Sequence, residues 1–93
     1  ENNNLVYEQN LSIIEAILGT EVRLQTPAGD LKFSVSPGTT HGKVLRISGK
    51  GVPDLNHNSV GDLFIRMNLK VPNTISDREK ELLIELSKSP NFN

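Results

Sequence analysis

The chain of 93 residues has no cysteine and no tryptophan, and its aromatic side chains are limited to one tyrosine and three phenylalanines. The absence of cysteine excludes disulfide bonds and cysteine-ligated zinc, and it is compatible with the reducing cytosol, so we expect a cytoplasmic protein. A hydrophobic content of 35% with so few aromatic residues leaves little material for a deep ligand cavity. The length predicts a single domain.

Neither sign of charge dominates, because 10 Lys and Arg residues stand against 11 Asp and Glu residues, for a formal net charge of −1. A nucleic-acid-binding module needs a basic stripe that displaces counterions, so nucleic acid is not expected as a partner. No apolar run approaches the roughly 20 residues that span a bilayer, and a membrane is not expected either. The chain begins with Glu1 and has no initiator methionine, so we expect a fragment of a longer protein.

The periodicity of the first part of the chain predicts one strand followed by one short helix. Residues 1–4 are polar, and we expect them to be disordered or part of a linker. Residues 5–9 are rich in β-forming side chains and are predicted as a strand. Residues 12–18 place isoleucine and leucine at helical spacing, and Ser12 with Glu15 has the spacing of a capping box. We therefore predict a short helix at residues 12–18.

Strict alternation of apolar and polar side chains predicts strands through the middle of the chain. Residues 22–26 and 31–35 flank a Pro-Ala-Gly-Asp sequence at 27–30 that is typical of a turn, so we predict a hairpin. Residues 43–47 form a further predicted strand, and residues 63–71 alternate without interruption. The sequence thus predicts a mainly β chain, in the form of a small β-sandwich of short antiparallel strands with a helix near each end.

The last segment has the features of an amphipathic helix. Ser76 and Glu79 form a second capping-box sequence, and an apolar stripe follows at Leu82, Leu83 and Leu86. Judged from the residues alone, the stripe either packs on its own sheet, which is the default, or contacts a second subunit.

No catalytic, cofactor or metal site is predicted. The segment Gly38-Thr39-Thr40-His41-Gly42-Lys43 resembles a phosphate-binding loop, but three residues instead of four separate its glycines, and a predicted strand follows instead of a helix. His41 and His57 are the only histidines, both in polar loops, and they are expected to be solvated side chains and not zinc ligands. A phosphate-handling enzyme using the loops at Gly42-Lys43 and Gly49-Lys50-Gly51 stays open as a minor alternative.

The order of the turn motifs resembles the second C-terminal domain of DnaJ-type co-chaperones, from about Leu5 to Ser89. Each motif alone indicates only a turn, but seven of them in this order and at fitting intervals are specific for the family. The motifs are Ile17-Leu18-Gly19, Thr26-Pro27-Ala28-Gly29, Pro37-Gly38-Thr39, Gly42, Arg46, Gly49-Lys50-Gly51-Val52-Pro53 and Gly61-Asp62-Leu63.

The resemblance implies a β-sandwich domain over residues 5–72 and a dimerisation helix with its tail over residues 73–93. For the C-terminal stripe it favours contact with a second subunit over packing on the chain's own sheet. In this family such a helix pairs two protomers, here through residues equivalent to Leu82, Leu83 and Leu86. The whole protein would carry a J domain that stimulates a DnaK-type ATPase. No His-Pro-Asp tripeptide is present in this chain, so neither that stimulation nor enzymatic activity is expected of it.

The resemblance also implies a client groove. Family members bind unfolded or hydrophobic segments in a shallow groove of the first of two similar domains, and the equivalent positions here are Tyr7, Gln9, Leu24 and Thr26. Two of these are polar, so we expect weak client binding that gains strength from two copies in a homodimer. The expected partners are unfolded client proteins, a second copy of the chain, and a DnaK-type chaperone through the full-length protein. The alternative is an assembly module of similar fold that binds no client.

Overall fold

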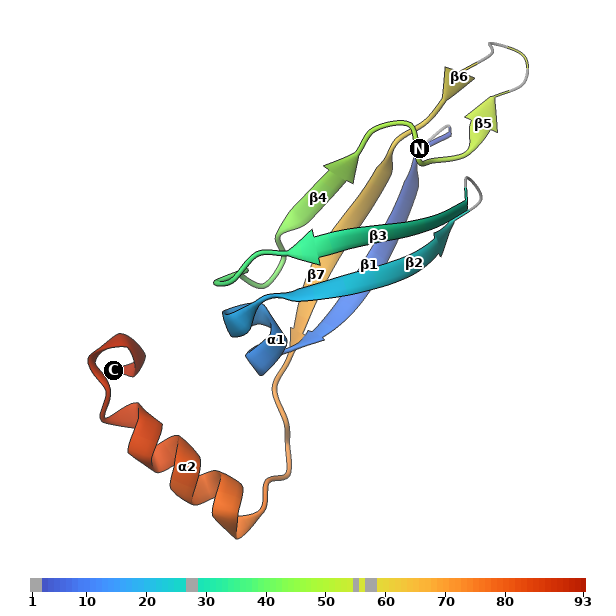
Figure 1. The fold of residues 1–93 in the computed structure, drawn as a ribbon. Helices are drawn as coiled ribbons and strands as arrows, with labels where there is room; N and C mark the ends of the chain where they lie inside the picture. Colours follow the sequence, from blue (N-terminus) through green and yellow to red (C-terminus); the bar gives the residue numbers. More distant parts are fainter. Residues whose placement is uncertain (1–2, 27–28, 55, 57–58) are drawn as a thin grey trace.

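A computed structural model describes residues 3–26, 29–54, 56 and 59–93 of the chain (Figure 1). Its largest sheet has three strands in the order β1-β7-β4, where β1 is Leu5–Ser12, β7 is Leu63–Lys70 and β4 is Val44–Ile47. The central position of β7 agrees with the long alternation that predicted it. This sheet is the layer on which the rest of the sandwich is built.

The second layer is a hairpin of β2 (Thr20–Thr26) and β3 (Gly29–Val35), which crosses one face of the sheet (Figure 1). Val22 pairs with Phe33 and Leu24 pairs with Leu31, as a turn between these strands requires. The turn residues Pro27 and Ala28 lie outside the described residues. The hairpin and the mainly β class are confirmed.

A small antiparallel pair, β5 (Pro53–Asp54) and β6 (Ser59–Val60), lies at one end of the sandwich. Both strands lie between the predicted strands at residues 43–47 and 63–71, where no strand was predicted. Two-residue strands carry no alternation, so the sequence gives no periodic signal for them.

The core lies between the two layers. Leu63, Ile65 and Met67 of β7 are fully buried and pack with Leu11 of β1 and Phe33 of β3. Fully burying such a side chain contributes on the order of 1.5–3 kcal/mol. The alternating residues of the central strand therefore supply most of the side chains that hold the hairpin to the sheet.

The prediction of antiparallel strands throughout is wrong for β1. This strand runs parallel to β7, with Leu5 opposite Leu63 and Leu11 opposite Leu69. Parallel neighbours need a long crossover connection, and here it contains α1 and all the strands from β2 to β6. The direction of this pairing depends on contacts between distant parts of the chain, which local periodicity does not report.

The short helix α1 (Ile13–Leu18) has the predicted capping box. The Ser12 Oγ accepts a hydrogen bond from the Glu15 N–H at 3.0 Å, and the Glu15 carboxylate accepts one from the Ser12 N–H at 2.9 Å. Ala16 is buried against the sheet, and the helix ends at Gly19, whose φ of 84° favours glycine.

The C-terminal helix stands apart from the sandwich. Residues 71–76 are all exposed, and they lead to α2 (Asp77–Ser87) and the 3-10 helix η1 (Pro90–Phe92). No residue of α2 is buried, and the whole molecule is elongated, with extents of 58 × 24 × 20 Å (Figure 1). The stripe of α2 is not packed on its own sheet, contrary to the default drawn from the residues alone. No described helix is long and apolar enough to cross a bilayer.

Candidate functional site

The apolar members of the expected client groove, Tyr7 and Leu24, lie at the meeting of the two layers. Both are partly buried and pack against the core, Tyr7 from β1 and Leu24 from β2. The Tyr7 hydroxyl donates a long hydrogen bond of 3.4 Å to the backbone carbonyl of Gln25. The structure thus brings β1 and β2 together at this point, as the groove requires.

The polar members of the groove are bonded to neighbouring backbone. The Gln9 side-chain amide donates to the Asn10 carbonyl at 3.2 Å, and the Thr26 hydroxyl donates to the Gly29 carbonyl at 2.6 Å. These bonds tie both side chains to local structure. Both side chains therefore have local partners, which leaves the backbone groups and the apolar side chains as the groups available for further contacts.

The hairpin presents an outer edge at β2, beside the expected groove residues Leu24 and Thr26. Among the described strands, β2 pairs only with β3. Alternate residues of an antiparallel pair direct their backbone groups away from the partner strand, and the Gln25 carbonyl that accepts from Tyr7 points in this way. Glu21 and Arg23 share the alternation of Gln25, so their backbone groups lie on the same outer edge. An edge of this kind is a template for adding a strand.

A hollow of about 450 Å³ lies on the same hairpin, formed entirely by residues of β2 and β3. Its two apolar members, Leu24 and Leu31, are cross-strand partners. Leu31 was missed in the sequence reasoning, although the symmetry of Leu24 and Leu31 about the predicted turn was a usable signal. The lining residues are Arg23, Leu24, Gln25, Asp30, Leu31 and Lys32.

The predicted interface residues of α2 form an unpartnered apolar face. Leu82, Leu83 and Leu86 are 46%, 52% and 40% exposed, and their spacing places them on one side of the helix. We call these three residues the α2 stripe. Ile84 is equally exposed but lies on the opposite face, and sequence reasoning had not singled it out. A helix of 11 residues without tertiary packing is marginal in water.

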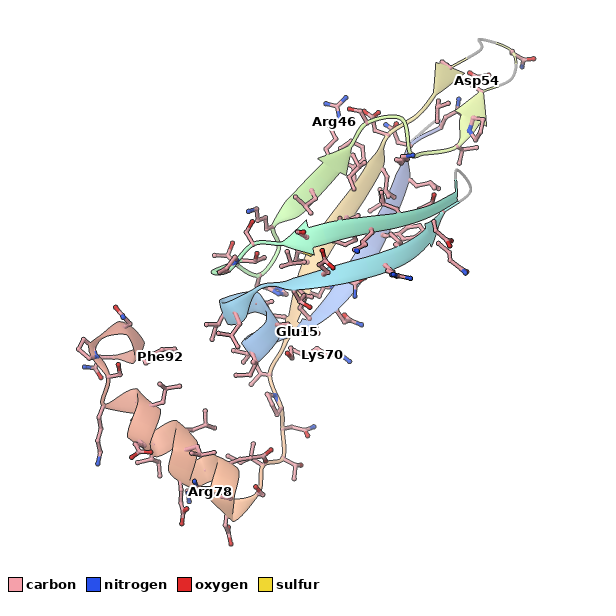
Figure 2. The ribbon with its side chains drawn as sticks, in the orientation of Figure 1. Glu15, Arg46, Asp54, Lys70, Arg78 and Phe92 are labelled. Atoms are coloured by element: carbon pink, nitrogen blue, oxygen red, sulfur yellow. The ribbon has the colours of Figure 1, made fainter. Side chains whose placement is uncertain are left out.

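The Gly49-Lys50-Gly51-Val52-Pro53 and Gly61-Asp62-Leu63 motifs meet at the end of the sandwich away from α1, around Asp62. The side chain of Arg46 donates from Nε to the Asp62 carboxylate at 2.7 Å, and the Gly49 N–H donates to the same carboxylate at 3.2 Å. The hydrogen bond from Arg46, and then the one from Gly49, hold the pKa of Asp62 below its ordinary value. Figure 2 shows Arg46 at this end and Glu15 with Lys70 at the opposite end.

The same motifs hold the start of β1. The Asn3 carbonyl accepts from the Val52 N–H at 2.7 Å, and the Asn4 side chain accepts from the Asp62 N–H at 2.8 Å. A Cβ on Gly61 would overlap the Asn3 carbonyl oxygen, so only glycine fits. Asn3 and Asn4 are thus hydrogen-bonded to the sandwich, while residues 1 and 2 lie outside the described residues, and the assignment of residues 1–4 to a disordered or linker segment stays a prediction.

The loops that resembled phosphate sites use their amides within the fold. The Gly42 N–H donates to the Met67 carbonyl at 2.8 Å, and the Gly38 N–H donates to the Ala16 carbonyl at 2.8 Å. The Gly49 N–H is taken by the Asp62 carboxylate, whose negative charge also opposes a phosphate. These glycines therefore serve as turns. His41 has a structural role as well, because its Nδ1 accepts from the Leu69 N–H at 3.0 Å, whereas His57 lies outside the described residues.

Comparison with known families shows which family the sandwich belongs to. Residues 1–72 match the model of the DnaJ C terminal domain. The chain belongs to the DnaJ C-terminal domain family. The match covers the two-layer sandwich described above, and it confirms the resemblance read from the order of the turn motifs.

Full-length relatives support the same family. The chain is 41% identical over 92 residues to the chaperone protein DnaJ of Bacteroides fragilis, which covers 99% of the chain and 23% of that protein. It is 38% identical over 88 residues to the chaperone protein DnaJ of Ruminiclostridium cellulolyticum, covering 95% of the chain and 23% of that protein. The chain thus spans about a quarter of the length of the DnaJ proteins that it matches. The roles of the groove residues and of the α2 stripe stay predictions.

Proposed function

We propose that this chain is a non-catalytic part of a DnaJ-type co-chaperone that binds unfolded or hydrophobic polypeptide segments weakly and joins two copies of the protein. The observation that carries the client-binding role is the outer edge of β2, which no other described strand pairs with, beside the Leu24–Leu31 pair. In the full-length protein, the bound client would be delivered to a DnaK-type ATPase. The chain itself supplies binding and assembly.

An extended client would add to β2 as a third strand of the hairpin sheet. Its backbone would exchange hydrogen bonds with the outward amides and carbonyls of Glu21, Arg23 and Gln25, and an apolar side chain would enter the hollow over Leu24 and Leu31. The Tyr7 hydroxyl would release the Gln25 carbonyl, which is a small cost because that bond is 3.4 Å long. Backbone pairing does not depend on client side chains, so it suits clients of many sequences.

Weak affinity follows from the size of the apolar contact. A single leucine pair lines the hollow, and the remaining lining side chains are polar or charged. Each copy therefore holds a client segment loosely, and a dimer gains affinity by offering two sites to one long chain.

The test is a backbone amide NMR titration with a permanently unfolded, apolar peptide. We expect localised shifts at residues 5–9 and 22–26. The matched control is the same peptide with alternate backbone nitrogens methylated, which keeps the side chains but removes the strand hydrogen bonds and should not bind. Silence of both peptides at millimolar concentration would leave the alternative of an assembly module without client binding.

The dimerisation role is carried by the exposed α2 stripe. We expect Leu82→Asp with Leu86→Asp to leave the sandwich folded and to abolish dimerisation in sedimentation experiments, because two charges replace the apolar side chains of the stripe. Ile84→Asp changes a side chain of similar exposure on the opposite face and should leave the dimer intact. Unfolding of the sandwich in the double variant would assign the stripe to the domain's own core.

A further inference from the structure

A second apolar surface lies on α1, at the end of the sandwich from which residues 71–76 leave β7 (Figure 1). Ile14, Ile17 and Leu18 are 59%, 37% and 70% exposed, and helical spacing places them together on the face opposite the buried Ala16. We call these three residues the α1 patch. Single exposed apolar side chains are ordinary on protein surfaces, but three adjoining ones on a six-residue helix form a contact surface.

We propose that the α1 patch of one copy packs against the α2 stripe of a second copy, and that the α2 stripe of the first copy packs against the α1 patch of the second. A two-fold dimer then contains two identical contacts, each of which we call a seam. This inference rests on the proposed dimerisation and adds its second surface. Both surfaces are on the same chain, as a closed two-fold interface requires.

The area needed by a stable dimer is the first reason. Three half-exposed leucines from each copy, packed only on their symmetry mates, would bury on the order of a few hundred Å², well below the roughly 1,200–2,000 Å² of a standard interface. Seating each stripe on the partner's α1 patch adds three large apolar side chains per seam. The contact between α2 helices alone is therefore small for a stable dimer, and the α1 patch is an exposed apolar surface that would enlarge it.

The path of the connecting segment explains why the partner's patch is used and not the chain's own. Pro72 restricts Val71 to extended backbone, so the chain continues outward from the end of β7 and does not turn back at once over α1. Residues 71–76 are all exposed, and α2 stands away from its own α1 (Figure 1). A helix carried outward in this way is placed to reach a second molecule.

The spacing of the two surfaces also agrees. The α1 patch has apolar residues at positions i, i+3 and i+4, and the α2 stripe has the same spacing when read from Leu86 back to Leu82. Antiparallel helices present their sequences to each other in opposite directions, so each of the three side chains meets an apolar neighbour.

The test is a complementation experiment with the 93-residue chain. One variant carries Ile14→Glu and Leu18→Glu in the α1 patch, and the other carries Leu82→Asp and Leu86→Asp in the α2 stripe. We expect each variant alone to have a dimer dissociation constant raised at least about tenfold. An equimolar mixture should form heterodimers, detected by native mass spectrometry, because the intact stripe of one copy meets the intact patch of the other in one seam. Ile84→Glu is the control for an added charge and should dimerise normally.

Each other result identifies a different arrangement. A patch variant that dimerises as tightly as the unaltered chain would overturn the role of the α1 patch and leave a dimer made by α2 alone. Two monomeric variants that form no heterodimer would overturn the reciprocal arrangement. An unaltered chain that is monomeric would overturn the proposed dimerisation itself. If amide spectra show that the charged patch variant does not fold, Ile14→Gln with Leu18→Gln replaces it.

Discussion

Asp62 joins three segments that are far apart in the chain. Its carboxylate binds Arg46 at the end of β4 and the Gly49 N–H, while its own N–H donates to the Asn4 side chain. Arg46 in turn lies over the ring of Phe64, 5.8 Å from its centroid. The Gly-Asp-Leu and Gly-Lys-Gly-Val-Pro motifs therefore have a structural purpose, which is to fix the start of β1 against β4 and β7.

We expect Asp62→Asn to lower the thermal midpoint and to remove a component of acid sensitivity. The folded pKa of Asp62 is depressed, so its contribution to stability is fully present above the unfolded value of about 3.8 and is lost as the pH falls through the lower folded pKa. Thermal melts of both proteins between pH 2 and pH 7 measure this. A variant whose melting temperature falls as steeply below pH 4 as that of the unaltered chain would contradict the role given to Asp62.

Gly61→Ala tests the close approach at Asn3. The added Cβ would overlap the Asn3 carbonyl group, so we expect a loss of about 1–3 kcal/mol in the free energy of unfolding, measured in urea. Hydrogen exchange of the Val52 amide, which donates to Asn3, should accelerate. Asn3→Ala keeps the backbone carbonyl and should change the free energy of unfolding little. Equal losses of free energy in the two variants would assign the stabilisation to the side chain of Asn3 and contradict this account.

At the scale of elements, the two capping boxes have different consequences. Ser12 caps α1, which packs on the sheet through Ala16, whereas Ser76 caps α2, which has no buried residue. We expect Ser12→Ala to lower the free energy of unfolding of the sandwich by about 1 kcal/mol.

Ser76→Ala should leave that free energy unchanged at concentrations where the chain is monomeric, and should instead reduce helical content and weaken dimerisation. Circular dichroism and denaturant titration separate these effects. Equal destabilisation of the sandwich by both variants would mean that α2 packs on it.

Local signals in the sequence accounted for these elements well. Ser12 with Glu15 and Ser76 with Glu79 predicted both helix starts, and the alternation of β7 predicted the strand at the centre of the main sheet. The hairpin followed from its turn chemistry. In each case the information lies within a few residues, where capping and alternation act.

Features that depend on distant contacts were not predictable in the same way. The parallel direction of β1 and the anchoring of Asn3 are both settled by segments far away in the chain. For the candidate site, the sequence indicated Tyr7 and Leu24 by resemblance, but it did not show that, among the described strands, β2 pairs only with β3. Pairing partners of an edge strand are a property of the whole fold.

At the scale of the whole molecule, a dimer would combine two weak client-binding sites. We expect an unfolded client with two apolar segments to bind the unaltered chain at least about tenfold more tightly than it binds the Leu82→Asp, Leu86→Asp variant. A short peptide with one segment should bind both equally, because each copy keeps its own β2 edge. Calorimetric titration measures both, and equal affinity of the long client for the two proteins would show that the copies act independently.

The most direct test of the central claim is to locate a bound peptide on the folded chain. A spin-labelled apolar peptide should broaden the amide signals of Glu21, Arg23 and Gln25 along the outer edge of β2. Residues on the outer face of the main sheet far from this edge, such as the paired Val44 and Arg66, should be unaffected. Broadening confined to Val44 and Arg66 would place the client on the sheet face and contradict strand addition at β2.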